Sequence, residues 1–218
     1  ITGMGCITPL GNQIDTLWTN IIAGRSGVDY ITHYDASEYK TRFAAEVRDF
    51  DGEALLGSRD ARRMDRFAQF AVAAAHQAVD SAGLAINDDN RDRIGVIIGT
   101  GIGGLGVLVE QMQIFLERGP SRVSPFLVPM MIPDTAAGLT AIHLGVRGPN
   151  MAVVTACATG TNAIGEATEI IRRGQADVML AGGSEATVVP LAMAGLSVMT
   201  ALSTRNDDPQ GASRPFDL

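Results

Sequence analysis

Apolar and polar positions follow two different periods along the chain, and this pattern predicts an α/β arrangement. Consecutive apolar, β-branched residues predict buried strands at residues 93–99, 151–156 and 177–183. Longer segments, in which apolar residues recur three or four positions apart, predict helices at residues 13–22, 61–82, 105–117, 134–144, 158–173 and 190–199. Strands that alternate with helices favour a mainly parallel sheet with helices on both faces.

The segment of residues 119–133 fits neither period. It holds four prolines among apolar residues, and proline disrupts both a helix interior and a central strand. Because it is too hydrophobic for a solvated linker, we expect an ordered loop that packs on another surface. The tail of residues 205–218 is polar and rich in turn residues, with no closing strand or helix after it.

Composition narrows the class of protein. The 218 residues are 46% hydrophobic and 19% charged, which favours a buried globular core. The net charge of -7 argues against a nucleic-acid binder, and no apolar run is long enough to span a membrane. The first residues lack the basic region of a signal peptide. Two cysteines, Cys6 and Cys157, make no disulfide framework, so a reducing, cytoplasmic location is expected.

Cys157 has the most informative surroundings, because it joins a predicted strand to a predicted helix in the sequence TACATG. Unpaired N–H groups and the helix dipole at a helix start favour an anion, and a nucleophilic cysteine must become a thiolate. The backbone N–H of Cys157 could also donate to an oxyanion at an attacked carbonyl. The alternative is a small buried side chain without chemistry, and position alone leaves both interpretations open.

Five ordered motifs change that balance. They are GMGCITPLG with GRSG, RIGVIIGTGIGG, TACATG, ADVMLAGGSEA and LSTRNDDPQGASRPFD. In this order, along the whole chain, they resemble the β-ketoacyl-[acyl-carrier-protein] synthases, closest to the type II elongating enzymes of fatty-acid synthesis. Polyketide ketosynthases are the nearest alternative.

The resemblance implies a fold and a reaction. It implies that residues 1–218 form the amino-terminal half of a thiolase-like fold, with a five-stranded type of sheet whose last strand is missing. Cys157 would be the catalytic nucleophile that takes an acyl group, which malonyl-[acyl-carrier-protein] then extends by decarboxylative condensation. The catalytic histidines would lie in the other half, so this chain alone is expected to be inactive. No cofactor is implied.

The glycine-rich stretch of residues 99–104 allows two interpretations. Gly-x-Gly-x-x-Gly between a strand and a helix matches a dinucleotide-binding fingerprint, which would make this an NAD-type domain. However, the proline-rich segment stands where the next strand with an acidic end is expected. The resemblance instead implies an acyl pocket at Gly101 and Ile102, with the Ile102 side chain toward the fatty-acyl chain.

Arginines recur at helical spacing near residue 60. Arg59, Arg62, Arg63 and Arg66 share one face if the helix begins that early. Spacing alone favours a solvated face with Asp60 and Asp65 as ion-pair partners. The resemblance implies an acidic acyl-carrier protein as partner, bound by Arg62, Arg63, Arg66 and Arg122.

Residues 151–156 also predict assembly. The resemblance implies that this strand is a sheet edge that pairs with its copy in a homodimer, and pairing would protect an apolar edge from aggregation. Leu127 would then reach the partner's acyl pocket as a substrate-binding residue.

The histidines, His33, His76 and His143, match no catalytic motif, and their spacing with carboxylates and cysteines gives no metal site.

Overall fold

The computed structural model describes residues 1–217, which form two compact units. The first unit comprises residues 1–6 and 51–186, and the second begins at residue 7, runs to residue 50 and resumes at residue 187. Leu218, the last residue of the expected domain 1–218, lies outside the described residues. Each unit is therefore built from two separated stretches of the chain.

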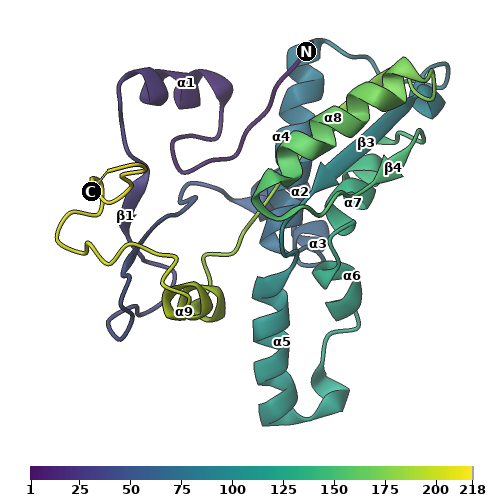
Figure 1. Cartoon of the computed structure of the whole chain (residues 1–218). Coiled ribbons are helices and arrows are strands. Elements are labelled where there is room, and N and C mark those ends of the chain that lie inside the picture. Colours follow the sequence, from purple (N-terminus) through teal and green to yellow (C-terminus); the bar gives the residue numbers. More distant parts are fainter. Residues whose placement is uncertain (218) are drawn as a thin grey trace. The chain divides into compact units, whose positions relative to one another are not determined.

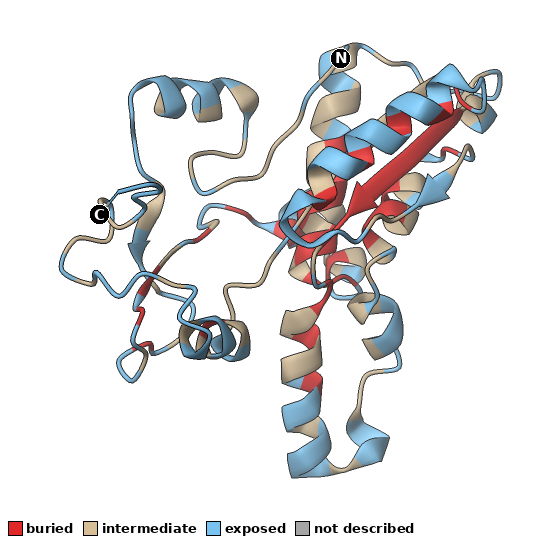
Figure 2. Ribbon diagram, in the orientation of Figure 1, coloured by how far each residue is buried: buried red, intermediate tan, exposed pale blue. Residues whose placement is uncertain are grey.

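The first unit is organised around a parallel three-stranded sheet (Figure 1). Strand β3 (Ile94–Gly99) lies between β4 (Asn150–Met151) and β5 (Val178–Gly183), in the order β4-β3-β5. All six residues of β3 are buried, as Figure 2 shows, so it is the central strand of the unit. A strand buried on both faces reads as a continuous apolar run, which is why the sequence predicted it.

Helices cover both faces of this sheet. Side chains of Ile94, Val96 and Ile98 pack in one cluster with α4 (Arg66–Ala82) and α7 (Thr135–Leu144). Ile97 points the other way and packs with Ala163 and Ile170 of α8 (Thr159–Arg172). This alternation along β3 confirms the expected α/β class with a parallel sheet between helices.

The sheet differs from the expected five-stranded type, since residues 1–217 contribute three strands to it. The first residues lie along α4. The N–H of Cys6 donates to Gln77 Oε1 at 3.0 Å, and a Cβ added at Gly5 would clash with the α4 backbone at Ala74. Only a glycine can approach a helix backbone this closely, so the segment packs on α4 rather than pairing in the sheet.

The helix expected over residues 61–82 is divided in two. A short helix, α3 (Ser58–Ala61), is followed by a turn, and α4 begins at Arg66 with Asp65 as its N-cap. The buried Asp65 carboxylate accepts the N–H of Phe67 at 3.2 Å and that of Val107 at 2.9 Å. Val107 is in the first turn of α5 (Leu105–Arg118), so one carboxylate caps two helices.

The proline-rich segment contains more helix than expected. It holds a 3₁₀ turn, η2 (Pro120–Arg122), and a short helix, α6 (Leu127–Met131). Pro129 is tolerated because it lies in the first turn of α6, where its missing N–H has no intrahelical acceptor. Buried Gln111 of α5 accepts the N–H of Ser124 at 2.7 Å, so the segment is ordered and packed, as expected. The unit is completed by α2 (Gly52–Leu56) and η1 (Arg91–Arg93).

The second unit joins the early and late parts of the chain. It contains α1 (Ile14–Ile22), the antiparallel strands β1 (Val28–Tyr30) and β2 (Phe43–Ala45), and α9 (Pro190–Val198). Asn206 ties the two stretches together, because its Oδ1 accepts the N–H of Arg42 at 2.9 Å and its carbonyl accepts the Tyr30 hydroxyl at 2.8 Å. Among residues 1–217, no helix is both long enough and apolar enough to cross a membrane.

Candidate active site

Cys157 lies on a tight turn at the start of α8. The 3₁₀ turn η3 (Ala156–Ala158) leads directly into Thr159, the first residue of that helix, and the Cys157 side chain is exposed. Ala156 has a φ of 51°, a left-handed conformation that costs a non-glycine residue about 1 kcal/mol. The chain thus holds the thiol at a helix start, as the sequence predicted, on a strained turn that the sequence did not reveal.

A buried threonine holds this strained turn in place. The hydroxyl of Thr159 donates to the Ala156 carbonyl at 2.7 Å and accepts the N–H of Thr155 at 2.9 Å. The Thr155 hydroxyl in turn donates to Asn162 Oδ1 at 2.9 Å. These bonds lock the residues before Cys157 onto α8, so the turn moves with the helix.

The end of β3 explains why β4 is so short. A Cβ added at Gly99 would clash with the Val153 carbonyl and with Cγ2 of Thr159. The backbone of Val153 therefore crosses over Gly99 instead of continuing beside it. Strand β4 consists of Asn150 and Met151, so Met151 is the one residue of the expected strand 151–156 that is paired. The glycine that follows Val96, Ile97 and Ile98 is what admits the cysteine turn at the end of the sheet.

The glycine loop lies beside this turn. A Cβ added at Gly101 would lie 3.6 Å from the backbone of Ala156, so the loop and the cysteine turn are in contact. The next residue, Ile102, has 52% of its surface exposed. The N–H of Gly104 donates to the Met131 carbonyl at 3.0 Å, which joins the loop to α6, the helix that begins with Leu127. The structure brings Gly101 to the cysteine turn and α6 to the loop.

One residue of this site was missed by the sequence analysis. The Glu185 carboxylate, just after β5, accepts the Gly101 N–H at 2.9 Å and the Thr100 hydroxyl at 3.1 Å. Glu185 and Gly101 are far apart in sequence and meet because β5 lies next to β3. The sequence offered one signal for this contact. Glu185 is an acidic residue at the end of one predicted strand, and the glycine loop follows the end of another.

The dinucleotide interpretation requires a strand soon after the helix that follows the glycine loop. In residues 1–217, α5 is followed by α6 and α7 before the chain reaches β4 at Asn150. A strand with an acidic end, about 20 residues after the glycines, is therefore absent from this part of the fold.

The structure does not place Arg59, Arg62, Arg63 and Arg66 on one helical stripe. Arg62 and Arg63 are exposed on the turn between α3 and α4, with the Arg63 guanidinium 4.6 Å from the centre of the Phe126 ring. Arg66 is half-buried, 5.0 Å from the centre of the Phe70 ring, and burial lowers its pKa. Arg122 is exposed on η2. The helix break at residues 62–65 is the reason, since the stripe required a continuous helix.

The remaining titratable residues considered from the sequence are the three histidines and Cys6, and their neighbours indicate a role in packing. The rings of His76 and His143 meet edge to face at 6.3 Å between α4 and α7, and the pKa of His76 is lowered by burial and by the neighbouring His143. His33 lies 3.5 Å from the Glu46 carboxylate in the second unit. Burial raises the pKa of the Cys6 thiol, which lowers the fraction of this cysteine that is thiolate.

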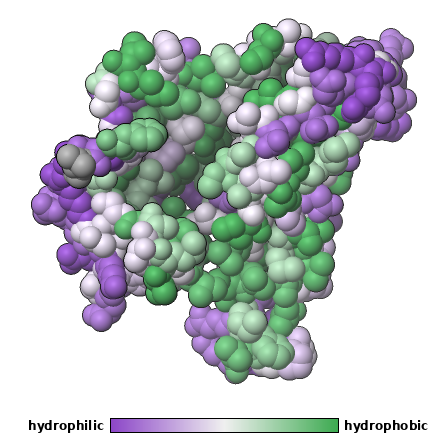
Figure 3. Space-filling model, in the orientation of Figure 1, coloured by the Kyte–Doolittle hydropathy of each residue, from purple (hydrophilic) through white to green (hydrophobic). Residues whose placement is uncertain are grey.

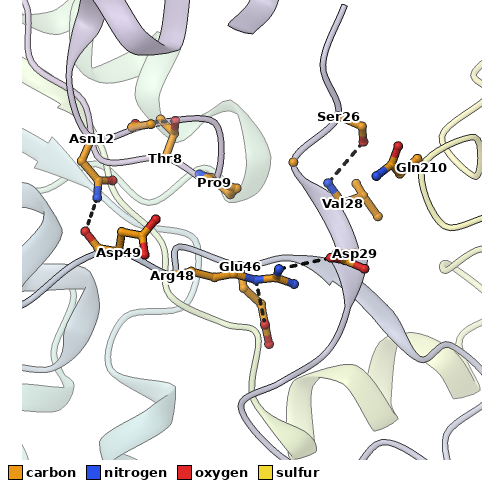
Figure 4. A pocket seen from close by; sticks show the side chains of 12 residues that line it. Thr8, Pro9, Asn12, Ser26, Val28, Asp29, Glu46, Arg48, Asp49 and Gln210 are labelled. Atoms are coloured by element: carbon orange, nitrogen blue, oxygen red, sulfur yellow. Dashed lines mark hydrogen bonds and ion pairs between the residues drawn. The ribbon is translucent and has the colours of Figure 1, made fainter.

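A polar cavity of about 200 Å³ lies wholly within the second unit and does not involve Cys157 (Figure 4). Its arginine, Arg48, is bound to Asp29 at 3.1 Å and lies 3.9 Å from Glu46. Burial pushes the pKa of Glu46 up, but hydrogen bonds from Thr32 and His33 outweigh it and hold the pKa below its usual value. The charges around this cavity therefore stabilise the unit itself.

Comparison with known proteins identifies the family. The β-ketoacyl synthase N-terminal domain matches residues 1–218, and the chain belongs to this family. It is 54% identical over 217 residues to a 3-oxoacyl-[acyl-carrier-protein] synthase 2 of Synechocystis, and 51% identical over 216 residues to one of Staphylococcus aureus. The alignments cover 100% and 99% of this chain but 52% of each relative, so the chain spans about half of their length.

A solved structure agrees with this assignment. The crystal structure of a β-ketoacyl synthase from Burkholderia phymatum superposes with a TM-score of 0.85 and 34% sequence identity. The superposition covers 100% of this chain and 53% of that chain. The similarity confirms both the resemblance and its position in the amino-terminal half.

Proposed function

We propose that this chain supplies the nucleophile of a fatty-acid-elongating 3-oxoacyl-[acyl-carrier-protein] synthase. The observation that carries the proposal is the exposed Cys157 on a strained turn at the start of α8, in contact with the glycine loop. Identity of 54% to a 3-oxoacyl-[acyl-carrier-protein] synthase 2 supports this choice over a polyketide ketosynthase. The activity belongs to a protein of the relatives' length, and this chain alone is expected to lack it.

The proposed reaction has two stages. In the first, the Cys157 thiolate attacks the acyl thioester on a carrier protein, and the carrier thiol leaves with a proton while the acyl group stays on sulfur. In the second, malonyl-[acyl-carrier-protein] loses CO₂, and the resulting carbanion attacks the Cys157 thioester and releases the thiolate. The N–H of Cys157 supports the oxyanion in both attacks. The product is a 3-oxoacyl chain two carbons longer.

The remaining residues have roles in binding. Gly101 and Ile102 form the wall of the acyl pocket, with Leu127 reaching it from the partner subunit of a homodimer. Arg62, Arg63, Arg66 and Arg122 attract the acidic carrier protein, and the first two are the best placed because they are exposed beside each other. A cytoplasmic location fits this carrier-dependent chemistry.

The test is acylation of the cysteine. A full-length protein carrying this chain is incubated with decanoyl-[acyl-carrier-protein], and peptides are analysed by mass spectrometry. We expect the decanoyl group on Cys157, its loss in Cys157→Ser, and its retention in the control Cys6→Ser. Addition of malonyl-[acyl-carrier-protein] should release a 3-oxododecanoyl product. Acylation elsewhere, or elongation by the Cys157→Ser variant, would show that Cys157 is not the nucleophile.

A further inference from the structure

Glu185 binds the glycine loop without taking part in the proposed reaction. It follows β5, and both of its carboxylate oxygens accept hydrogen bonds from the loop after β3, from Gly101 N–H at 2.9 Å and from the Thr100 hydroxyl at 3.1 Å. A hydrogen bond to an ionised acceptor is about twice as strong as a neutral one. The side chain is exposed, yet its polar atoms are directed to one loop.

The loop is fixed on both sides of Ile102. On one side, the Thr100 hydroxyl bound to Glu185 also accepts the N–H of Gly103 at 3.1 Å. On the other, the N–H of Gly104 donates to the carbonyl of Met131 at 3.0 Å. The Ile102 side chain, by contrast, is half-exposed. The anchoring bonds therefore determine where this side chain can go.

The same contact reaches the nucleophile. A Cβ added at Gly101 would lie 3.0 Å from Glu185 Oε2 and 3.6 Å from the backbone of Ala156, the strained residue just before Cys157. Gly101 thus lies beside both the Glu185 carboxylate and the cysteine turn. A loss of the Glu185 bonds would free the loop to move relative to the thiol.

We propose that Glu185 is a positioning residue that fixes Gly101 and Ile102 beside Cys157 and so keeps the passage for a long acyl chain preformed. That the bound group is an acyl chain rests on the proposed function, whereas the position of Gly101 and Ile102 that Glu185 fixes does not. A passage that is already ordered saves the ligand the entropy of ordering it. A short group, which does not extend past Ile102, needs no such passage.

Two alkylating reagents test this without any turnover. Iodoacetamide and N-dodecyliodoacetamide carry the same reactive group, so their rate ratio at Cys157 cancels any effect of Glu185 on the thiol itself. The rates are measured in a full-length protein carrying this chain, at one pH, by mass spectrometry of the Cys157 peptide. Thermal unfolding of each variant verifies that it is folded.

In Glu185→Ala we expect the ratio of long to short reagent to fall about tenfold, the order of effect of one lost hydrogen bond to a charged group. Glu185→Gln keeps an acceptor oxygen for Gly101 and should stay within about threefold of the unmodified protein. Glu53→Ala removes an exposed carboxylate of α2 as a matched control and should leave the ratio unchanged. An unchanged or higher ratio in Glu185→Ala, or an equal fall in Glu185→Gln, would overturn the proposal.

The outcome is separate from that of the proposed function. If the unmodified protein takes no acyl group on Cys157, the proposed function fails, yet the alkylation ratio still decides the role of Glu185. If acylation occurs and the ratio does not change in Glu185→Ala, only the positioning role is wrong.

Discussion

The two cysteines have opposite surroundings. Cys157 is exposed at a helix start, whereas Cys6 is half-buried beside α4 and burial raises its pKa. A raised pKa lowers the fraction of reactive thiolate at neutral pH. We therefore expect iodoacetamide to modify Cys157 at least about fivefold faster than Cys6. Peptide mapping of this chain after timed exposure measures both rates, and faster modification of Cys6 would contradict the assignment.

Ile102 offers a second residue-scale prediction. Its side chain stands on a fixed loop beside the cysteine turn, so added volume there should shorten the acyl passage. In a full-length protein, Ile102→Phe is expected to slow acylation by dodecanoyl-[acyl-carrier-protein] about tenfold and by acetyl-[acyl-carrier-protein] less than about twofold. Ile102→Val is the control, because it reduces volume at the same position. Equal losses with both primers would remove Ile102 from the pocket wall.

At the scale of elements, Asp65 connects two helix starts. Its buried carboxylate accepts N–H groups from both α4 and α5, so Asp65→Ala removes two caps at once. We expect a loss of about 2 kcal/mol in the free energy of unfolding, measured with urea. Asp51→Ala, which removes the exposed single cap of the short helix α2, should cost less. Equal losses in the two variants would show that the shared cap contributes nothing extra.

The same residue predicts a pH dependence. Burial raises the pKa of Asp65 above its ordinary 3.8, although the N–H groups of Val107, Phe67 and Arg66 pull it down. A raised folded-state pKa means that the neutral carboxyl is favoured by folding, so this contribution is complete below pH 3.8 and is lost as the pH rises through the folded-state pKa. The free energy of unfolding of the unmodified chain, relative to that of Asp65→Asn, should therefore decrease as the pH rises through the folded-state pKa. A difference independent of pH would contradict the shift.

The helices and strands were largely predictable from the sequence, whereas the close contacts between distant backbone segments were not. Continuous apolar residues identified β3, and helical periodicity located α5, α7 and α8 within one or two residues. The start of α4 was placed too early because the apolar periodicity continues before Arg66, whereas Asp65 is the residue that caps the helix. The short β4 was overextended because its end depends on Gly99 admitting the Val153 carbonyl. Likewise the sequence predicted the position of Cys157 at a helix start and of a glycine turn after β3, whereas the contact of Glu185 with that turn depends on the strand order.

At the scale of the whole molecule, the sheet leaves apolar edges. β4 is an edge strand with Met151 exposed, and Val154, three residues beyond it, is exposed as well. Figure 3 shows hydrophobic side chains gathered over α5, where Met112, Phe115 and Leu116 are exposed. Such surfaces favour the proposed homodimer.

Val154→Lys tests this assembly, because the Val154 side chain is exposed. Val153 is not suitable, since it packs against the cluster of Ile97, Ala163 and Ile170 and its change would disturb the core. In a full-length protein the variant should sediment largely as monomer, because two like charges would face each other across the two-fold axis. Val154→Leu is the matched apolar control and should remain dimeric. A dimeric Val154→Lys with full activity would exclude this edge as the interface.

The interleaved order of the two units has a consequence for biosynthesis. The first stretch of the second unit leaves the ribosome early, but its partner residues follow much later: Arg42 binds Asn206, 164 residues further along the chain. At common translation speeds this separation is a wait on the order of 10 s, long enough for the intervening sheet unit to fold first. Residues 7–50 therefore remain without their partner stretch during that interval, and the second unit is completed only after the sheet unit has been synthesised.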